Sequence, residues 1–414
     1  MKTAFDIAIV GAGPAGAAAA TLLARAGWSV ALIERQPFPR RKVCGECVAA
    51  SNLSLLDALG VGAEFDALAG AELRRVALMR GRRTVFAPLP RGQDGRHAWG
   101  RALGREHLDT LLVGGAEAAG ATVLQPWSLQ SIAGHAPTFR LQVRPSAGEG
   151  GSVELEAAVV IAAHGSWEPL PAERAQRREA RRASDLFAFK ANFTGAAIDA
   201  DVLPVLCFAG GYGGMVIADG GVATLACCVR ADRLQALRRA QPGASAGEAI
   251  ETMLRRECDG VGLALAGATR LGPWLASGPL RPGIRSGLAD GVFRIGNAAG
   301  EAHPIVGEGM SMALQSAFVL AASIGPRRLQ LTSGTGAAAA QRAAIVTFEA
   351  LWRRRFARRL RVAAAFAHIA MRPALAGVAW PLLRLWPGAL THGARFSGKT
   401  RCAPEAACLR AIAP

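Results

Sequence analysis

Three glycines near the start of the chain, Gly11, Gly13 and Gly16, have the GxGxxG spacing of a dinucleotide-binding turn. The first glycine allows a tight turn, the second lets a pyrophosphate approach the backbone, and the third lets a helix pack closely on a strand. The phosphates would then meet free N–H groups at the start of that helix. We therefore predict that these glycines, together with Ala15, form one part of a nucleotide site.

The elements around this turn follow the order that a nucleotide-binding unit requires. A strand is predicted over 5–10, an alanine-rich helix follows the glycines, and a second strand is predicted over 29–33. Glu34 ends that strand at about the distance at which a carboxylate holds a ribose 2′-OH, and Arg35 follows it. Strand, turn, helix, strand and acid together predict that the chain binds an adenine dinucleotide.

A second glycine-rich segment lies over 296–310, with the sequence GNAAGEAHPIVGEGM. It resembles the second FAD motif of flavoproteins with the p-hydroxybenzoate-hydroxylase-like fold. The sequence KVCGE over 42–46 is similar to a loop of the geranylgeranyl-reductase-like branch of these proteins. The chain thus resembles FAD-dependent oxidoreductases and monooxygenases of this fold, from about residue 6 to about residue 320.

The resemblance implies cofactor-binding roles for further residues. Asn297 stands where the family usually has an aspartate that bonds the ribityl or phosphate portion of FAD; its side-chain oxygen can still accept a hydrogen bond, but it lacks the charge. Gly307, Gly309 and Met310 would present backbone N–H groups to the flavin edge where negative charge gathers on reduction. Arg105 matches an arginine that contacts the cofactor near its phosphates.

Two residues are candidates for catalysis. Cys44 lies in the loop that the resemblance places near the flavin ring, where the basic residues 40–42 would favour a thiolate that tunes the flavin or donates a proton. His303 precedes the flavin-facing turn and could act as an acid or base on the substrate side. Packing roles are the alternative for both. Cys44 and Cys47 have no second pair of ligands at metal-binding spacing, so no metal site is expected.

These motifs predict an α/β fold: a Rossmann-like, three-layer FAD-binding domain with an inserted β-sheet substrate domain and C-terminal helices. The FAD-binding domain is expected to be discontinuous, over 1–72, 99–183 and 278–330. The substrate domain is expected over 73–98 and 184–277, and the C-terminal helical region over 331–414.

The C-terminal region should pack one helical face against the rest of the protein. Trp352, Phe356, Leu360 and Ala363 share that face, and arginines cover the others. The apolar run 362–383 is broken by an Arg-Pro pair, so it is not expected to cross a membrane. A cap over the core is one interpretation of this region. A basic amphipathic element that lies on a membrane, or lines the way in for a greasy substrate, is the other.

The net charge of +17 comes almost wholly from arginine. It predicts attraction to an anionic partner, either a membrane surface or an acidic carrier protein. No basic stripe interleaved with aromatic residues is present, so nucleic acid is not an expected partner. Eight scattered cysteines and an N-terminus unlike a signal peptide predict a cytoplasmic protein with reduced thiols that can also touch a membrane.

The expected function is that of an FAD-dependent oxidoreductase of secondary metabolism. The leading hypothesis is a monooxygenase that hydroxylates an apolar or aromatic metabolite through a flavin C4a-hydroperoxide, with NAD(P)H as electron donor. An alternative, favoured by KVCGE, is reduction of isoprenoid C=C bonds, and a flavin-dependent halogenase ranks below both. A non-enzymatic flavin-binding redox sensor or electron carrier is also open, because Asn297 and His164 depart from the family pattern.

Overall fold

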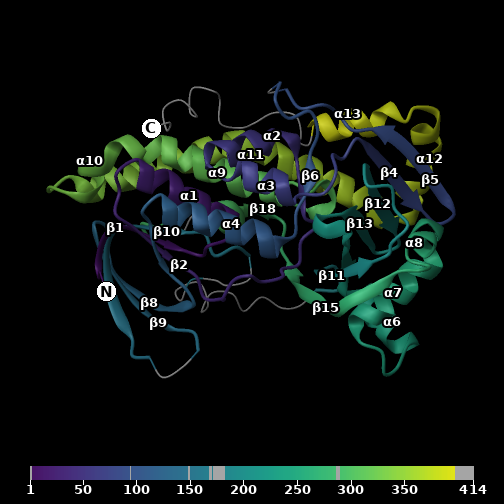
Figure 1. Ribbon diagram of the computed structural model, residues 1–414, viewed down its shortest axis with the longest axis horizontal. Helices are drawn as coiled ribbons and strands as arrows, with labels where there is room; N and C mark the ends of the chain where they lie inside the picture. The colour runs from purple at the N-terminus through teal and green to yellow at the C-terminus, as the bar shows by residue number, and fades with distance from the viewer. Residues whose placement is uncertain are drawn as a thin grey trace.

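The computed structural model describes residues 2–93, 95–147, 150–166, 170, 182–285 and 290–396. Two large sheets lie at opposite ends of the molecule, and helices bridge them (Figure 1). Residues 397–414, the end of the predicted C-terminal region, lie outside the described residues, as does most of the linker around 174–182.

The first sheet has a parallel core that continues into an antiparallel arm. Its strand order is β7-β2-β1-β10-β9-β8, and β17 pairs with β10. The pairs among β7, β2, β1, β10 and β17 are parallel, whereas β10, β9 and β8 pair antiparallel. The strands are β1 Ala4–Val10, β2 Val30–Ile33, β7 Thr122–Leu124, β8 Trp127–His135, β9 Thr138–Pro145, β10 Val153–Ala162 and β17 Phe293–Arg294.

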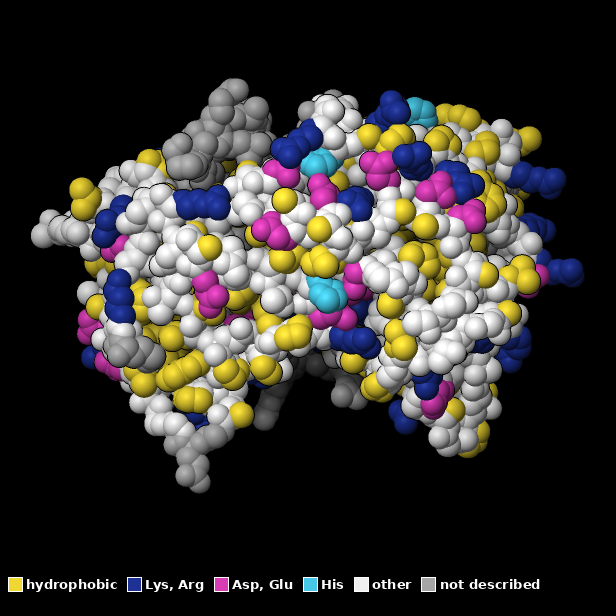
Figure 2. Space-filling model, viewed as in Figure 1, with side chains coloured by type: hydrophobic (Ala, Val, Ile, Leu, Met, Phe, Trp, Pro, Cys, Tyr) yellow, Lys and Arg dark blue, Asp and Glu magenta, His cyan; other side chains and the backbone are white. Residues whose placement is uncertain are grey.

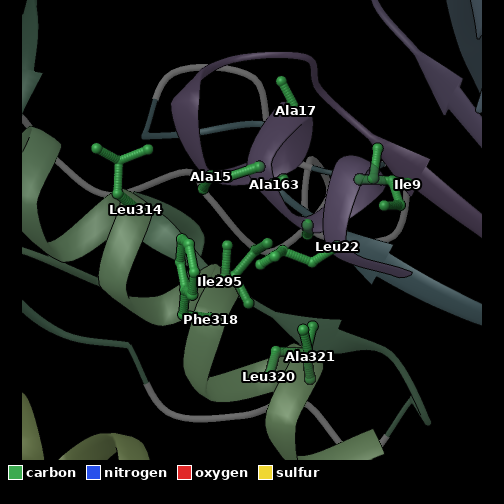
Figure 3. Close-up of a cluster of buried hydrophobic side chains, with 14 of the residues drawn as sticks. Ile9, Ala15, Ala17, Leu22, Ala163, Ile295, Leu314, Phe318, Leu320 and Ala321 are labelled. Carbon is green, nitrogen blue, oxygen red and sulfur yellow. The ribbon is translucent and has the colours of Figure 1, made fainter. Parts of the chain in front are cut away.

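Helices cover one face of this sheet. α1 lies against α9, with Leu22 of α1 facing Phe318 of α9 across Ile295 (Figure 3). Small alanines along α1 allow this close approach, because its buried face is almost entirely alanine. The helices of this layer are α1 Pro14–Arg25, α2 Ala50–Ala58, α3 Gly62–Leu68, α4 Arg105–Ala118 and α9 Gly309–Ile324.

The second sheet is mostly antiparallel and has the strand order β15-β11-β14-β13-β12-β4-β5. Only the pair of β12 and β4 is parallel among its described ladders. Its strands are β4 Arg75–Arg80, β5 Arg83–Pro88, β11 Leu186–Thr194, β12 Val202–Phe208, β13 Gly211–Ile217, β14 Ala223–Arg230 and β15 Thr269–Leu280. Three helices pack on it: α6 Ala231–Ala240, α7 Ala246–Glu257 and α8 Asp259–Ala264.

The C-terminal helices connect the two sheets. α11, Ala337–Met371, packs on α9 and then reaches β12 and β13, so it runs along the length of the molecule (Figure 1). The predicted face is confirmed, because Trp352, Phe356, Leu360 and Ala363 are all buried. The remaining helices are α10 Arg328–Thr332, α12 Pro373–Leu385 and α13 Gly388–Phe396, and the short pairs β3 Cys47–Val48 with β6 Arg101–Ala102 and β16 Gly283–Ile284 with β18 Gly300–Glu301 complete the described fold.

Two stretches are long and apolar enough to be compared with a membrane span. The first, Gly309–Thr332, has 72% of its apolar window buried inside the protein, as in a core helix. The second is the pair α11 and α12, which is bent by 102°. The bend falls at Arg372 and Pro373, because a residue before proline disfavours the helical conformation. The observed architecture confirms the predicted α/β fold class.

Candidate functional site

The turn between β1 and α1 is closed on one side and open on the other. Gly11 has a φ of +103°, and a Cβ there would lie 2.7 Å from the carbonyl oxygen of Ala163. A Cβ on Gly16 would lie 1.8 Å from the carbonyl oxygen of Gly11, so both positions need glycine. Among the described residues, a Cβ on Gly13 would meet only the Arg105 guanidinium, 3.9 Å away. The turn therefore keeps open the face where a pyrophosphate is predicted.

Glu34 lies directly behind this turn. Its carboxylate accepts hydrogen bonds from the backbone N–H groups of Ala12 and Gln36, both at 2.9 Å, and Arg40 lies 3.6 Å away. Glu34 is buried, whereas Arg35 is exposed. The acid thus ties the end of β2 to the glycine turn, and its predicted contact with a ribose stays a prediction.

The second glycine turn touches the first. Gly296 has a φ of +57°, and a Cβ there would lie 2.9 Å from the Cβ of Ala15. The neighbouring Asn297 donates its side-chain amide to the Ser166 hydroxyl at 3.0 Å. This leaves the amide oxygen of Asn297 as the acceptor that it can offer to a ribityl hydroxyl. Two motifs that are distant in the sequence therefore form one site.

The start of α9 supplies the opposite wall of this site. Gly307 adopts the left-handed conformation, with a φ of +64°, and α9 begins two residues later at Gly309. No described atom lies within 4 Å of the position of a Cβ on Gly309. The positive end of the helix dipole and its N–H groups therefore face open space, as the predicted stabilisation of a reduced flavin requires.

A buried ion-pair network lies under the KVCGE loop. Glu46, itself in a left-handed conformation with a φ of +57°, accepts hydrogen bonds from the Lys190 ammonium and the Thr224 hydroxyl of the second sheet. It also accepts one from the backbone N–H of Arg105 at 3.0 Å. Arg105 in turn forms two 2.7 Å hydrogen bonds to the Asp109 carboxylate. Glu46 thus joins the loop to both sheets.

Sequence reasoning did not find Lys190 or Thr224. Lys190 is one of only four lysines, and it stands between phenylalanines in the run FAFKANF, where a lone cation signals a buried partner. Its side chain is fully buried. That pattern was available in the sequence, but the identity of its partner depends on how the two sheets meet.

The groups around Cys44 are basic. The backbone N–H of Glu46 lies 3.4 Å from the Cys44 sulfur. Burial, and then the charges of Arg105 and Arg40, lower the pKa of Lys42 to about 8. Burial also acts to lower the pKa of Arg105, but Asp109 and Cys44 hold it above its ordinary value. This surrounding charge favours anionic groups at the mouth of the glycine turn.

His303 lies behind Tyr212 rather than at the surface of the site. Its Nδ1 lies 3.2 Å from the Tyr212 hydroxyl, and its ring centroid lies 6.1 Å from that of His368. Burial, and then His368, lower the pKa of His303 to about 4, so the ring is neutral at neutral pH. Burial, followed by the influence of Cys228, raises the pKa of Tyr212 well above its ordinary value.

One large cavity, of about 900 Å³, runs from the two glycine turns to the second sheet and the C-terminal helices. Burial raises the pKa of Cys207 and of Cys228 to about 12, so both thiols add protonated, weakly polar surface. Of the predicted site residues, eight line this cavity: Gly13, Ala15, Cys44, Arg105, Asn297, Gly307, Gly309 and Met310.

The other predicted residues lie outside the cavity wall. Gly11 and Gly16 support the turn, and Glu34 and Arg35 lie beyond it. Among the described residues that line the cavity, Ala302 and Pro304 flank His303, but His303 is absent. The far end of the cavity, made of Phe366, Ile369, Trp380, Leu382 and Leu383, comes from the C-terminal helices that sequence reasoning left as a cap or a way in for substrate.

The site's chemistry fits an FAD. Its glycine cradle is open to a flat dinucleotide at Gly13 and Gly309, where a Cβ would meet little or nothing. Two helix N-termini, those of α1 and α9, point at this cradle and suit the phosphates and the flavin edge. Arg105 and Lys42 add positive charge for the anionic portion of the cofactor.

Comparison with known proteins agrees with this assignment. The sequence profile of the FAD binding domain family matches residues 4–327. The chain is similar to tryptophan 2-halogenase from Chondromyces crocatus, with 30% identity over 160 residues, which is 38% of this chain and 30% of that protein. It is also similar to menaquinone reductase from Mycobacterium tuberculosis (strain ATCC 25618 / H37Rv), with 32% identity over 165 residues, or 40% and 38% of the two chains. The matches thus span well under half of these relatives.

Solved structures share the fold over nearly the whole chain. The flavin-dependent brominase Bmp2 has a TM-score of 0.74 at 16% identity, covering 99% of this chain and 98% of that one. A geranylgeranyl bacteriochlorophyll reductase-like protein from Thermoplasma acidophilum has a TM-score of 0.72 at 16% identity, with coverage of 99% and 96%. PqsL of Pseudomonas aeruginosa, a probable FAD-dependent monooxygenase, has a TM-score of 0.66 at 20% identity, with coverage of 96% and 99%.

Proposed function

The chain belongs to the FAD binding domain family, and we propose that it is a monooxygenase that hydroxylates a largely apolar, aromatic substrate. The observation that carries this proposal is the single cavity that extends from the FAD cradle between the second sheet and the C-terminal helices. A bound FAD would occupy the glycine end, which leaves the apolar end for the substrate. When bound and reduced, FAD supplies electrons and activates O₂ in such enzymes.

The residues of this chain have separate tasks in the proposed reaction. Val76, Leu78 and Val205 line the substrate end, bind the apolar substrate and exclude water. Tyr212 is the polar group in this wall, and its hydroxyl is held by His303. Because His303 is neutral and Tyr212 stays protonated, the pair can accept a proton from a substrate hydroxyl through Tyr212 and hold it at His303.

The overall reaction balances with an external two-electron donor. One oxygen atom of O₂ enters the substrate as a hydroxyl, and the other leaves as water, with two electrons and two protons supplied. We propose NAD(P)H as the donor.

Reduction of an isoprenoid C=C bond is the second candidate. It is favoured by the position of the KVCGE loop, because Cys44 lines the cavity beside Arg105 and can donate a proton there. Menaquinone reductases among the curated relatives support it as well. In this reaction one carbon receives a hydride from the reduced cofactor and the other receives the proton.

One experiment separates these reactions without assuming the donor. The FAD-loaded protein is reduced anaerobically with dithionite, and it is then mixed with isotopically labelled O₂ and nonylphenol, or kept anaerobic with a short-chain menaquinone. Label in a hydroxylated phenol supports the monooxygenase, and two added hydrogens in the menaquinone support the reductase. Reoxidation with neither product would contradict both and favour an electron carrier. The Gly13→Val variant, expected to lack FAD, is the control.

A further inference from the structure

The outer face of α12 is apolar and exposed. Leu375, Val378, Leu382 and Leu385 recur at intervals of three and four residues, so they share one side of the helix. Their exposed fractions are 44%, 74%, 66% and 84%. Trp380, on the opposite side, is buried. Large aliphatic side chains grouped in this way mark an interaction surface rather than ordinary scattered exposure.

This apolar face is continuous with the mouth of the cavity. Leu382, Leu385 and Trp386 line the cavity and are also exposed, Trp386 by 60%. The cavity therefore reaches the surface beside the outer face of α12. Since α12 turns by 102° away from α11, it lies across the end of the molecule. Its exposed face therefore points outward from the substrate end.

The surroundings of this face are basic. In the sequence 350–396 there is no aspartate or glutamate, and Arg372, Arg384 and Arg395 are exposed. Arg80 of the neighbouring hairpin donates a 2.9 Å hydrogen bond to the first carbonyl of α12, which brings β4 to the same edge. Figure 2 shows hydrophobic side chains gathered at the upper right, over α12 and α13, with lysine and arginine side chains along the right margin.

The combination of charge and apolar surface selects one occupant. A second copy of the chain would bring arginines of 350–396 together with no acid from that segment to pair with them. An acidic protein would meet the arginines but would gain less from a convex row of leucines. An anionic bilayer offers both partners, because its headgroups attract arginine and its acyl region accepts aliphatic side chains.

We propose that α12 and the start of α13 dock the protein on an anionic lipid surface, with the apolar face of α12 inserted at the level of the headgroups. The cavity mouth then opens toward the acyl region. This would let a lipophilic substrate pass from the bilayer without crossing water, and that last step alone rests on the proposed function.

The test measures binding of the FAD-loaded protein to vesicles by co-sedimentation. We expect binding to vesicles rich in phosphatidylglycerol, little binding to pure phosphatidylcholine, and weaker binding as salt is raised. The double variant Leu375→Glu/Val378→Glu places two charges on the exposed face but leaves the cavity wall intact. We expect its bound fraction to fall by about tenfold or more.

Controls make each outcome decisive. Leu329→Glu changes a residue of α10 that is 77% exposed, at the other end of the molecule, and should bind like the wild type. Both variants should keep the flavin absorbance and melting temperature of the wild type, because the substituted side chains are on the surface. Equal binding by the double variant, or binding that ignores lipid charge, would overturn the proposal. So would a dimer, seen by light scattering, that the double variant abolishes. Because the measurement is binding, its result does not depend on whether the enzyme turns over.

Discussion

At Gly13 the backbone leaves room for a ligand, whereas at Gly16 it leaves none, and the two residues therefore support opposite predictions. Gly13→Val should fold normally but fill the pyrophosphate site, because its Cβ would meet only the flexible end of Arg105. We expect affinity for FAD to fall by roughly a hundredfold or more, a cost of about 3 kcal/mol. Titration followed by flavin fluorescence measures this directly.

Gly16→Val is the matched control for that titration. Its Cβ would lie 1.8 Å from the carbonyl oxygen of Gly11, so it should lower the melting temperature as well as FAD binding. If Gly13→Val also unfolded the protein, or if it bound FAD normally, the open face of the turn would not be the phosphate site.

Glu46 and Lys190 form a buried pair in which each partner needs the other. Removing only one charge, as in Lys190→Met, leaves the carboxylate buried and should destabilise the protein by about 3–5 kcal/mol in urea unfolding. The double variant Glu46→Gln/Lys190→Met should recover part of that loss. The exposed acid Glu72, paired with Arg74, is the control, and Glu72→Gln should cost well under 1 kcal/mol. Equal losses in the single and double variants would contradict the pairing.

His303 should make stability depend on pH. Burial and His368 lower its pKa from 6.5 to about 4 in the folded protein. Between these values the unfolded chain binds a proton that the folded protein excludes, so stability should fall as pH drops from about 6.5 to about 4. The loss should be about 3 kcal/mol at most. Melting temperatures across this range should fall less for His303→Gln than for the wild type, whereas the exposed His392→Gln should follow the wild type.

At the scale of elements, α11 holds the two sheets in one arrangement. Phe356 is fully buried where α11 packs on the FAD side, so Phe356→Ala should cost about 3–5 kcal/mol of unfolding free energy. Val346 lies on the same helix but is 68% exposed, so Val346→Ala should change stability by less than about 0.5 kcal/mol. Similar melting temperatures for both variants would show that α11 is not a structural tie.

Element types could largely be predicted because their hydrophobic periodicity is local. The helix face at Trp352 and the hairpin of β4 and β5 follow directly from it. Two segments predicted as separate strands, 153–155 and 157–163, are one strand, β10. Its first half alternates between buried and exposed residues while its second half is buried on both sides, so the change of pattern reflects the covering layers and not a break.

At the scale of the whole molecule, the cavity predicts a separation of cofactor and substrate effects. Val205 lines the substrate end, and Val205→Trp should fill it without touching the glycine turns. We expect FAD affinity to stay at the wild-type value while turnover of a long-chain substrate falls by about tenfold or more. Val205→Ala, which enlarges the same space, is the control and should retain turnover. Equal loss of FAD from Val205→Trp would contradict the division of the cavity.

The motifs could be predicted because each nucleotide-binding turn is a local sequence with a fixed physical task. The cavity wall could not be predicted from them. It depends on where α11 carries Phe366 and Ile369, and on how Glu46 meets Lys190 across two sheets. The domain limits stay predictions, as do the cofactor contacts of Glu34 and Arg35. Long-range packing, which sets these contacts, leaves only weak traces in a single sequence.

The contact of Gly296 with Ala15 has a consequence for synthesis of the protein. A ribosome releases the first glycine turn early, but that turn lacks its counterpart until the chain has grown past Met310. A nascent chain should therefore stay colourless through most of translation and turn yellow only near completion. Flavin colour would then report, in a living cell, the moment at which distant halves of the chain have met.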